Sequence, residues 1–413
     1  MNALQRYLPA YAILSVAAVL IVPVAALEPL WISIIAALAA VAAILGSASR
    51  REWPRLHRTL TWLLAALVIW GAVSTVWSIV PDRSASQALR LLLIAAGTTF
   101  LLSAALSLDP AGRKTLETFL IAGVVLGLLF MLFELATGGL VHGALNGFEK
   151  NPVKNLFELN RASSVISIAA WVAIIPVWRR FGWIGAGILV LLSGFVIWQL
   201  QPGSPFLAIT VGAGFFAVAW FAPRLALIAL LAAVVASLVM IPFIAKLTPI
   251  VTELIRNLGI SEFSLLHRMA IWEFASERLL TQPIVGWGLD ASRAVGSGQM
   301  VSVDDAPNLG ARTVEVLPLH PHNALIQAWL ELGVPGALIV GGLFACIIVS
   351  IWRGITGKLE RAAACAAVAA AFVNAELSFG IWQGWWLSGL ALFAILTTAL
   401  VAPSRASEAS EPA

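Results

Sequence analysis

The stretch "LPLHPHNALIQAWLELGVPGALIVGGLFACIIVSI", residues 317–351, joins a polar motif to an apolar run. Two of the chain's five histidines, His320 and His322, lie in this motif directly before Asn323. The run that follows matches the roughly 20 residues that a helix needs to cross the hydrocarbon core of a bilayer. Runs of comparable length recur along the whole chain. The sequence therefore predicts an all-α, polytopic membrane helix bundle.

The composition supports this fold class. Hydrophobic residues make up 60% of the 413 residues and charged residues 11%, against roughly 25% charged residues in soluble proteins. A membrane β-barrel would instead show alternating segments of about 10 residues. We count about twelve transmembrane helices, with cores near 10–27, 29–46, 60–79, 88–107, 115–137, 161–178, 182–200, 205–222, 225–243, 333–351, 361–379 and 384–402.

The basic residues fall in alternate loops of this count. Short loops rich in arginine and lysine face the cytoplasm, which predicts cytoplasmic termini and a periplasmic loop over 244–332. The first span reads as an uncleaved signal-anchor, and the net charge of +4 gives no sign of nucleic-acid binding. The basic loop residues are Arg50, Arg51, Arg55, Arg58, Arg113, Lys114, Arg179, Arg180, Arg224, Arg353, Lys358 and Arg361.

The chain then divides into four parts. Residues 1–243 form a bundle of about nine spans, 244–332 a periplasmic loop, 333–402 three further spans and 403–413 a small, polar tail that we expect to be disordered in the cytoplasm. The two cysteines both lie in apolar spans, so no disulfide framework is expected.

The long loop has helical patterning of its own. "SEFSLLHRMAIWEFASERLLTQP" (261–283) carries apolar residues at helical spacing, with Ser261 or Ser264 as its cap and Pro283 at its end. After "GWGLDASR" we expect a polar loop to Thr313. "HPHN" then opens a second short helix, which Gly333 and Pro335 interrupt before the next span.

Four charged residues lie near span ends on the predicted periplasmic side: Arg90, Glu134, Arg161 and Glu376. A charge within a span is costly and usually faces a polar cavity or a partner. Together they predict a polar cavity open to the outer leaflet, with structural pairing of either glutamate to an arginine as the alternative.

Such a cavity suits a phosphate ligand. Arginine matches phosphate oxygens with its planar fork, the long loop adds Arg268, and a nearby histidine can take a proton from a hydroxyl. A metal site is less well supported, since Asp304 and Asp305 lack a third ligand and the two histidines are only two residues apart. The alternative for "HPHN" is a helix cap, with Asn323 or His322 as capping residue.

Two segments resemble a known family. "HPHNALIQAWLELGVPG" resembles the histidine motif of the bacterial O-antigen ligase family, and "HRMAIWEFASERLLTQPIVGWGLDASR" resembles the segment that precedes it there. About twelve spans with one long periplasmic loop before the tenth are similar as well. By motif the resemblance covers roughly 264–336, and O-antigen polymerases and some protein O-oligosaccharyltransferases share both motifs.

The resemblance implies a glycosyltransferase of the bacterial inner membrane. Its donor would be an undecaprenyl-diphosphate-linked glycan and, in ligases, its acceptor lipid A–core, with no metal, nucleotide or other cofactor. Carried onto this sequence, the essential arginine is Arg268 and the essential histidine is His322. Many members carry a Ser-Arg pair where this chain reads "QLQPGSPFLAI", without arginine. Arg161, in "ELNRASSV", is our candidate replacement.

The expected mechanism is inverting transfer. Arg268 and Arg161 would bind the diphosphate and stabilise the leaving group, and His322 would deprotonate or orient the acceptor hydroxyl. A polymerase differs only in its acceptor. A lipid-linked glycan transporter would show midplane charges and broken helices, for which 202–205 is one candidate. Residues expected to contact the substrate or support the site are Arg90, Arg293, Trp272, His320, Asn323 and Glu331.

Overall fold

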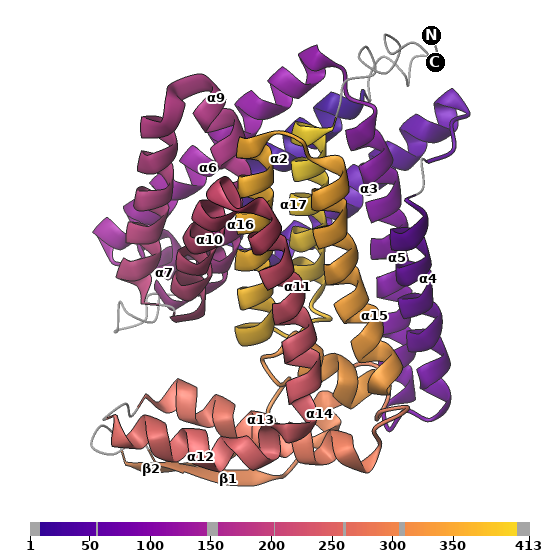
Figure 1. The fold of residues 1–413 in the computed structure, drawn as a ribbon, viewed down its shortest axis with the longest axis vertical. Helices are drawn as coiled ribbons and strands as arrows, with labels where there is room; N and C mark the ends of the chain where they lie inside the picture. The colour runs from indigo at the N-terminus through magenta and orange to yellow at the C-terminus, as the bar shows by residue number, and fades with distance from the viewer. Residues whose placement is uncertain are drawn as a thin grey trace.

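The computed structural model describes residues 9–54, 57–146, 156–201, 203–258, 262–304 and 310–402. The tail 403–413, for which we expected disorder, lies outside these residues. Helices dominate the chain (Figure 1). They are α2 (Ala10–Leu27), α3 (Ile32–Arg50), α4 (Arg58–Val73), α5 (Pro81–Leu106), α6 (Pro110–Thr137), α7 (Leu140–Asn146), α9 (Leu159–Leu200), α10 (Gly203–Phe221), α11 (Pro223–Met240), α12 (Ile244–Asn257), α13 (Phe263–Thr281), α14 (Ser292–Val295), α15 (Ala324–Gly354), α16 (Lys358–Leu377) and α17 (Gly384–Val401), with short 3-10 turns at Pro29–Trp31, Ser74–Val76 and Ile241–Phe243.

The all-α membrane fold is confirmed. Ten helical segments of the described chain are long and apolar enough to cross a membrane. Two features explain why ten segments are found where we predicted about twelve transmembrane helices. Gly182 has non-helical angles (φ 70°, ψ −172°), so α9 consists of two helices. The alanine-rich α16 falls outside the ten, yet it is largely buried and packs against α9 and α10.

The predicted basic loops gather at one end of the bundle. Arg179, in the middle of α9, contacts Glu117 of α6 at 2.5 Å and Glu360 of α16 at 2.8 Å. Lys358 lies over the ring of Trp220, at the end of α10, at 4.5 Å. Loops that are far apart in sequence therefore meet, as alternate crossing of a bilayer requires.

The opposite end carries a separate layer. Helices α12 and α13 run across the foot of the bundle, and the strands β1 (Met300–Asp304) and β2 (Ala311–Glu315) lie beyond them (Figure 1). The strands pair antiparallel, from Met300 with Glu315 to Asp304 with Ala311. Our expectation of a polar loop to Thr313 was wrong here, because the valines and threonine of "MVSVD" and "ARTVE" alternate with polar residues, a pattern that favours strands.

Helix α13 matches the predicted helix, but its cap differs. Glu262 is the N-cap, and its side chain accepts a hydrogen bond from the backbone N–H of Leu265 at 3.2 Å. Ser264 lies inside the helix, and Ser261 lies outside the described residues. The helix ends at Thr281, as Pro283 predicted.

Helix α15 is broken at Gly333, which has a φ of 66°. The backbone of residues 283–288 packs into this break. Val334 donates its N–H to the Pro283 carbonyl at 2.9 Å, and Gly288 donates to the Glu331 carbonyl at 2.8 Å. The interruption predicted from Gly333 and Pro335 is confirmed, and it is where the segment after α13 docks onto the bundle.

Candidate functional site

The histidine motif is held by the segment that joins α16 to α17. The ring Nδ1 of His322 lies 2.6 Å from the Ser378 carbonyl oxygen, and Gly380 donates its N–H to Nε2 of His320 at 3.2 Å. The side chain of Asn323 hydrogen-bonds Glu376. Residues 376–380 thus run along the motif and hold each of its polar side chains.

Asn323 caps a helix, as the alternative interpretation of "HPHN" predicted. Its side-chain oxygen accepts the N–H of Ile326 at 2.8 Å, which makes it the N-cap of α15. His322 lies one residue earlier and has a left-handed backbone with a φ of 55°. That conformation is unusual for a non-glycine residue.

The contacts of His322 fix its tautomer. A carbonyl oxygen can only accept, so Nδ1 carries the proton and donates it to Ser378. Nε2 is then an acceptor, and no hydrogen-bond partner of it is recorded among the residues that the structure describes. Burial, together with the positive charge of Arg268, lowers the pKa of His322 below 6.5. The ring is therefore neutral near pH 7, with a free lone pair on Nε2.

His320 has a different environment. Its ring lies 4.3 Å from that of His322, and its Nδ1 accepts the backbone N–H of His322 at 3.2 Å. Burial is the main reason why its pKa falls to about 3, with His322 and Arg268 adding to the effect. A neutral ring can accept from only one of the two backbone N–H groups that face it, and a protonated ring could accept from neither, so His320 supports the loop and stays uncharged.

Helix α13 adds Arg268 and Trp272, which are one turn apart. Trp272 donates its indole N–H to the Pro321 carbonyl at 2.8 Å, so it holds the motif from the other side. Arg268 is half-buried, and within the described residues it forms no ion pair. Burial lowers the pKa of Arg268, against the opposing effect of Glu262. An arginine without a counter-ion beside two neutral histidines is suited to an anion.

Glu331 joins three segments behind the motif. Its carboxylate is fully buried and accepts five hydrogen bonds, at 2.5–3.3 Å. The donors are the backbone N–H groups of Asp290 and Ser292, the hydroxyl of Ser292, the amide of Gln327 and the indole of Trp382. Such saturation offsets the cost of burying a carboxylate.

A cavity of about 640 Å³ lies between α3, α5 and α17. Its walls are mostly apolar, and they include both Arg90 and Arg161. Gln383 also lines the cavity, and its amide nitrogen lies 3.4 Å from Nε2 of His320. Two of the four predicted intramembrane charges therefore share one cavity, which a glutamine connects to the histidine motif.

The other predicted residues lie elsewhere or are structural. Glu134 pairs with no arginine of the described chain; it binds Nδ1 of His142 at 2.5 Å and the N–H groups of Val141 and His142, so it holds α7 against α6. Arg293 is exposed on α14, and no recorded contact brings it to the histidines. No three His, Cys, Asp or Glu side chains of the described chain form a metal-binding group.

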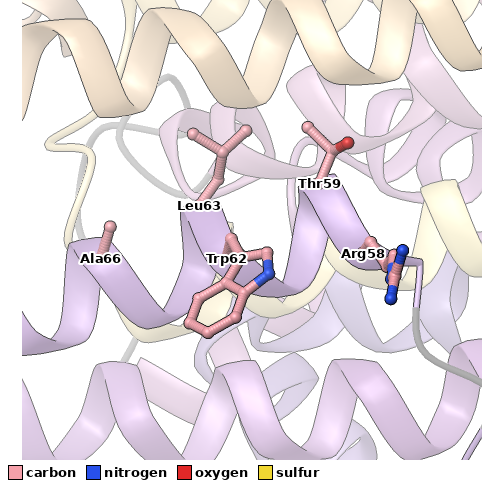
Figure 2. A pocket seen from close by; sticks show the side chains of 5 residues that line it. All are labelled: Arg58, Thr59, Trp62, Leu63 and Ala66. Atoms are coloured by element: carbon pink, nitrogen blue, oxygen red, sulfur yellow. The ribbon is translucent and has the colours of Figure 1, made fainter.

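A second cavity, of about 680 Å³, lies along the first turns of α4 (Figure 2). Arg58, Thr59, Trp62, Leu63 and Ala66 line it. Arg58 begins α4, whereas the other end of this helix, at Ser74, bonds Leu289 beside the Glu331 network. This cavity is thus separated by the length of α4 from the candidate site.

Comparisons with known proteins agree with this geometry. Residues 188–341 match the model of a family described as O-antigen ligase. Over these residues the chain is similar to the O-antigen ligase family. The matched region runs from the second half of α9 through α13 to the first part of α15, so it contains Arg268, Trp272 and the histidine motif.

Similar proteins from three Rickettsia species are each named "putative polysaccharide ligase". The chain is 27% identical to the one from Rickettsia prowazekii over 70% of its length and 68% of the relative's. It is 28% identical to the one from Rickettsia conorii over the same shares, and 26% identical to the one from Rickettsia felis over 81% and 79%. These findings support an O-antigen ligase-type, glycosyl-transferring function.

Three site residues were not foreseen. Ser378, Gln383 and Trp382 contact the motif or its support through the α16–α17 connection. The sequence contains one indication of their role. The segment "SFGIWQGWW" (378–386) places polar and aromatic residues between two spans, and a simple turn would need neither.

Proposed function

We propose that this protein transfers a glycan from an undecaprenyl-diphosphate carrier to lipid A–core at the periplasmic face of the bacterial inner membrane. The observation that carries the proposal is the free Nε2 of His322 beside Arg268, an arginine with no ion-pair partner among the described residues. One group can accept a proton and the other can hold a phosphate, and both stand at the end of a membrane bundle.

The donor would bind across two regions. The apolar walls of the cavity between α3, α5 and α17 suit a polyprenyl chain, and Arg90 and Arg161 in the same cavity suit its diphosphate. Arg161 would thus replace the arginine that "QLQPGSPFLAI" lacks. Gln383 joins this cavity to His320, so a diphosphate held there would lie towards Arg268 and His322.

Transfer would proceed by inversion. Nε2 of His322 accepts the proton of the acceptor hydroxyl while its oxygen attacks the anomeric carbon from the face opposite the diphosphate. The bond from the anomeric carbon to the diphosphate oxygen breaks, and its electron pair stays on the leaving diphosphate. The charge that develops there is stabilised by Arg268 and Arg161, and the Ser378 carbonyl stabilises the imidazolium through Nδ1–H.

Deletion of the gene tests the acceptor. A ligase deletion should remove all long chains from lipopolysaccharide and accumulate lipid-linked polymer. A core that still carries a single repeat unit would identify a polymerase, the alternative within the family. Purified protein that moves lipid-linked glycan across a bilayer without forming a new glycosidic bond would identify a transporter and overturn the proposal.

A further inference from the structure

Helix α12 exposes an apolar face that no segment of the described chain covers. Its exposed apolar residues recur at spacings of three and four residues, which places them on one side of a helix. They are Leu247, Ile250, Val251, Leu254 and, just beyond the helix end, Leu258, with exposed fractions of 37–67%.

The same helix has two other faces. Thr248 is buried, and the backbone N–H of Ala245 donates to Ser276 of α13 at 3.3 Å, so one flank packs against α13. Lys246, Glu253 and Arg256 are exposed. At 3.6 residues per turn Arg256 lies opposite the apolar stripe, Lys246 and Glu253 lie on one flank of it, and the α13 contact lies on the other flank.

The apolar stripe continues from a membrane-crossing helix. Val235 and Val239 of α11 and Phe243 of the connecting turn are exposed by 49–57%. They precede Leu247 at steps of four residues. The surface that meets lipid on α11 therefore extends without interruption onto α12, which runs crosswise at the foot of the bundle (Figure 1).

We propose that α12 lies in the outer leaflet as an interfacial helix, with the lipid bilayer as the occupant of its apolar stripe. Its apolar side chains enter the boundary between headgroups and acyl chains, and its charged face stays in water. Lys246, on the flank of the stripe, then lies at the level of the lipid phosphates, and Arg256 faces water. Since α12 packs on α13, the layer that carries Arg268 is fixed at the membrane surface.

Spin labels on the full-length protein in lipid nanodiscs test this placement. Cys346 and Cys365 are first replaced by alanine, and single cysteines are then placed at Ile250 or Leu254, with Val239 as the lipid reference and Glu253 as the water reference. Power saturation compares collisions with oxygen, which concentrates in the bilayer, and with a water-soluble nickel chelate. We expect the oxygen-to-nickel ratio at Ile250 and Leu254 to approach that at Val239 and to exceed that at Glu253 severalfold.

Two results would overturn the proposal. A ratio at Ile250 and Leu254 equal to that at Glu253 would mean that the stripe faces water. Low collision rates with both reagents would mean that protein covers it. If either labelled variant is not monodisperse, Leu247 and Val251 provide the same measurement on the same stripe.

Discussion

At the scale of single residues, His322 shows how the site is prearranged. A left-handed backbone at a non-glycine residue costs about 1–3 kcal/mol and persists only where its surroundings enforce it. Here the Ser378 carbonyl holds the ring, His320 holds the backbone N–H, and Trp272 holds the preceding carbonyl. This arrangement leaves one nitrogen of His322 free, which a residue acting only as a helix cap would not require.

His322→Ala should lower glycan transfer by about 10²–10⁴-fold, because it removes proton transfer. Binding of a lipid-diphosphate analogue should persist, since the arginines remain. Transfer in membranes is measured per amount of folded protein. His320→Ala, which removes a support and not a base, should have a milder effect. Near wild-type transfer by folded His322→Ala would disprove the catalytic role.

The pH dependence should report the coupling between His322 and Arg268. His322 acts as a base when neutral, and its lowered pKa keeps it neutral as the pH falls to 6.5. The transfer rate should therefore decrease on the acidic side (the acidic limb of the pH–rate profile) only below pH 6.5. Arg268→Ala removes one cause of the lowering and should move the limb to higher pH, although burial remains.

Arg268→Lys is the matched control for this shift. It keeps the charge, so the limb should stay in place, but an ammonium lacks the planar fork and binding of the analogue should weaken. An identical limb in the wild type and in Arg268→Ala would separate the arginine from the histidine. Unchanged analogue binding by Arg268→Ala would move diphosphate recognition to Arg161 and Arg90.

Glu331→Gln should destabilise the protein by about 1–3 kcal/mol, because the new NH₂ group must face donors and leaves some of them unpaired. All five recorded contacts of the carboxylate are donors. Thermal unfolding in detergent measures the change, with the exposed Glu253→Gln as control. Equal unfolding temperatures for the two variants would show that the network tolerates an amide.

At the scale of elements, the break in α15 depends on Gly333. A Cβ there would overlap the backbone of Ile284, and the backbone angles of Gly333 (φ 66°, ψ −167°) cost an L-residue about 1–3 kcal/mol. Gly333→Ala should therefore lower the unfolding temperature and transfer together, because it displaces the 283–288 segment. Gly214→Ala on α10, where a Cβ meets nothing within 4 Å, should change neither. Wild-type stability of Gly333→Ala would mean that the two segments do not need this close contact.

The sequence predicts elements better than their contacts. Hydrophobic runs and the Gly333–Pro335 pair located the spans and the break in α15 within a few residues. Helix α12 was missed, because its apolar residues were read as part of a loop after the span near 225–243. The β1–β2 hairpin was missed because its strands are short and half polar.

The candidate site follows the same division. His320, His322, Asn323, Arg268 and Trp272 could be found from local motifs, and the structure brings them together. The contributions of Ser378 and Gln383 could not be found from local motifs. Each depends on a contact between segments about 60 residues apart. The shared cavity of Arg90 and Arg161 likewise depends on which helices are neighbours, which hydrophobicity alone does not specify.

At the scale of the whole molecule, the two ends of the bundle differ in charge pairing and in architecture. One end carries the contacts of Arg179 with Glu117 and Glu360, and the other carries the α12–α13 layer. We expect the first end to face the cytoplasm, by the positive-inside rule, and the layer to face the periplasm.

Cysteine labelling tests this orientation. In a cysteine-free background, an impermeant maleimide added to intact spheroplasts should label a cysteine at Ser297 and leave one at Ser49 unlabelled until the membrane is opened. Ser297 is exposed after α14, and Ser49 lies near the end of α3. Labelling of both positions from one side would contradict the twelve-span topology.

The hydrogen bonds from residues 376–380 to the histidine motif have a consequence for biosynthesis. Ribosomes make the motif first, and its partners Glu376, Ser378 and Gly380 emerge more than fifty residues later. A nascent chain that has inserted α15 therefore exposes His322 without the carbonyl that sets its tautomer. The enzyme becomes competent only when its last two helices have entered the membrane, so chains truncated before α16 should be inert even if their loop is intact.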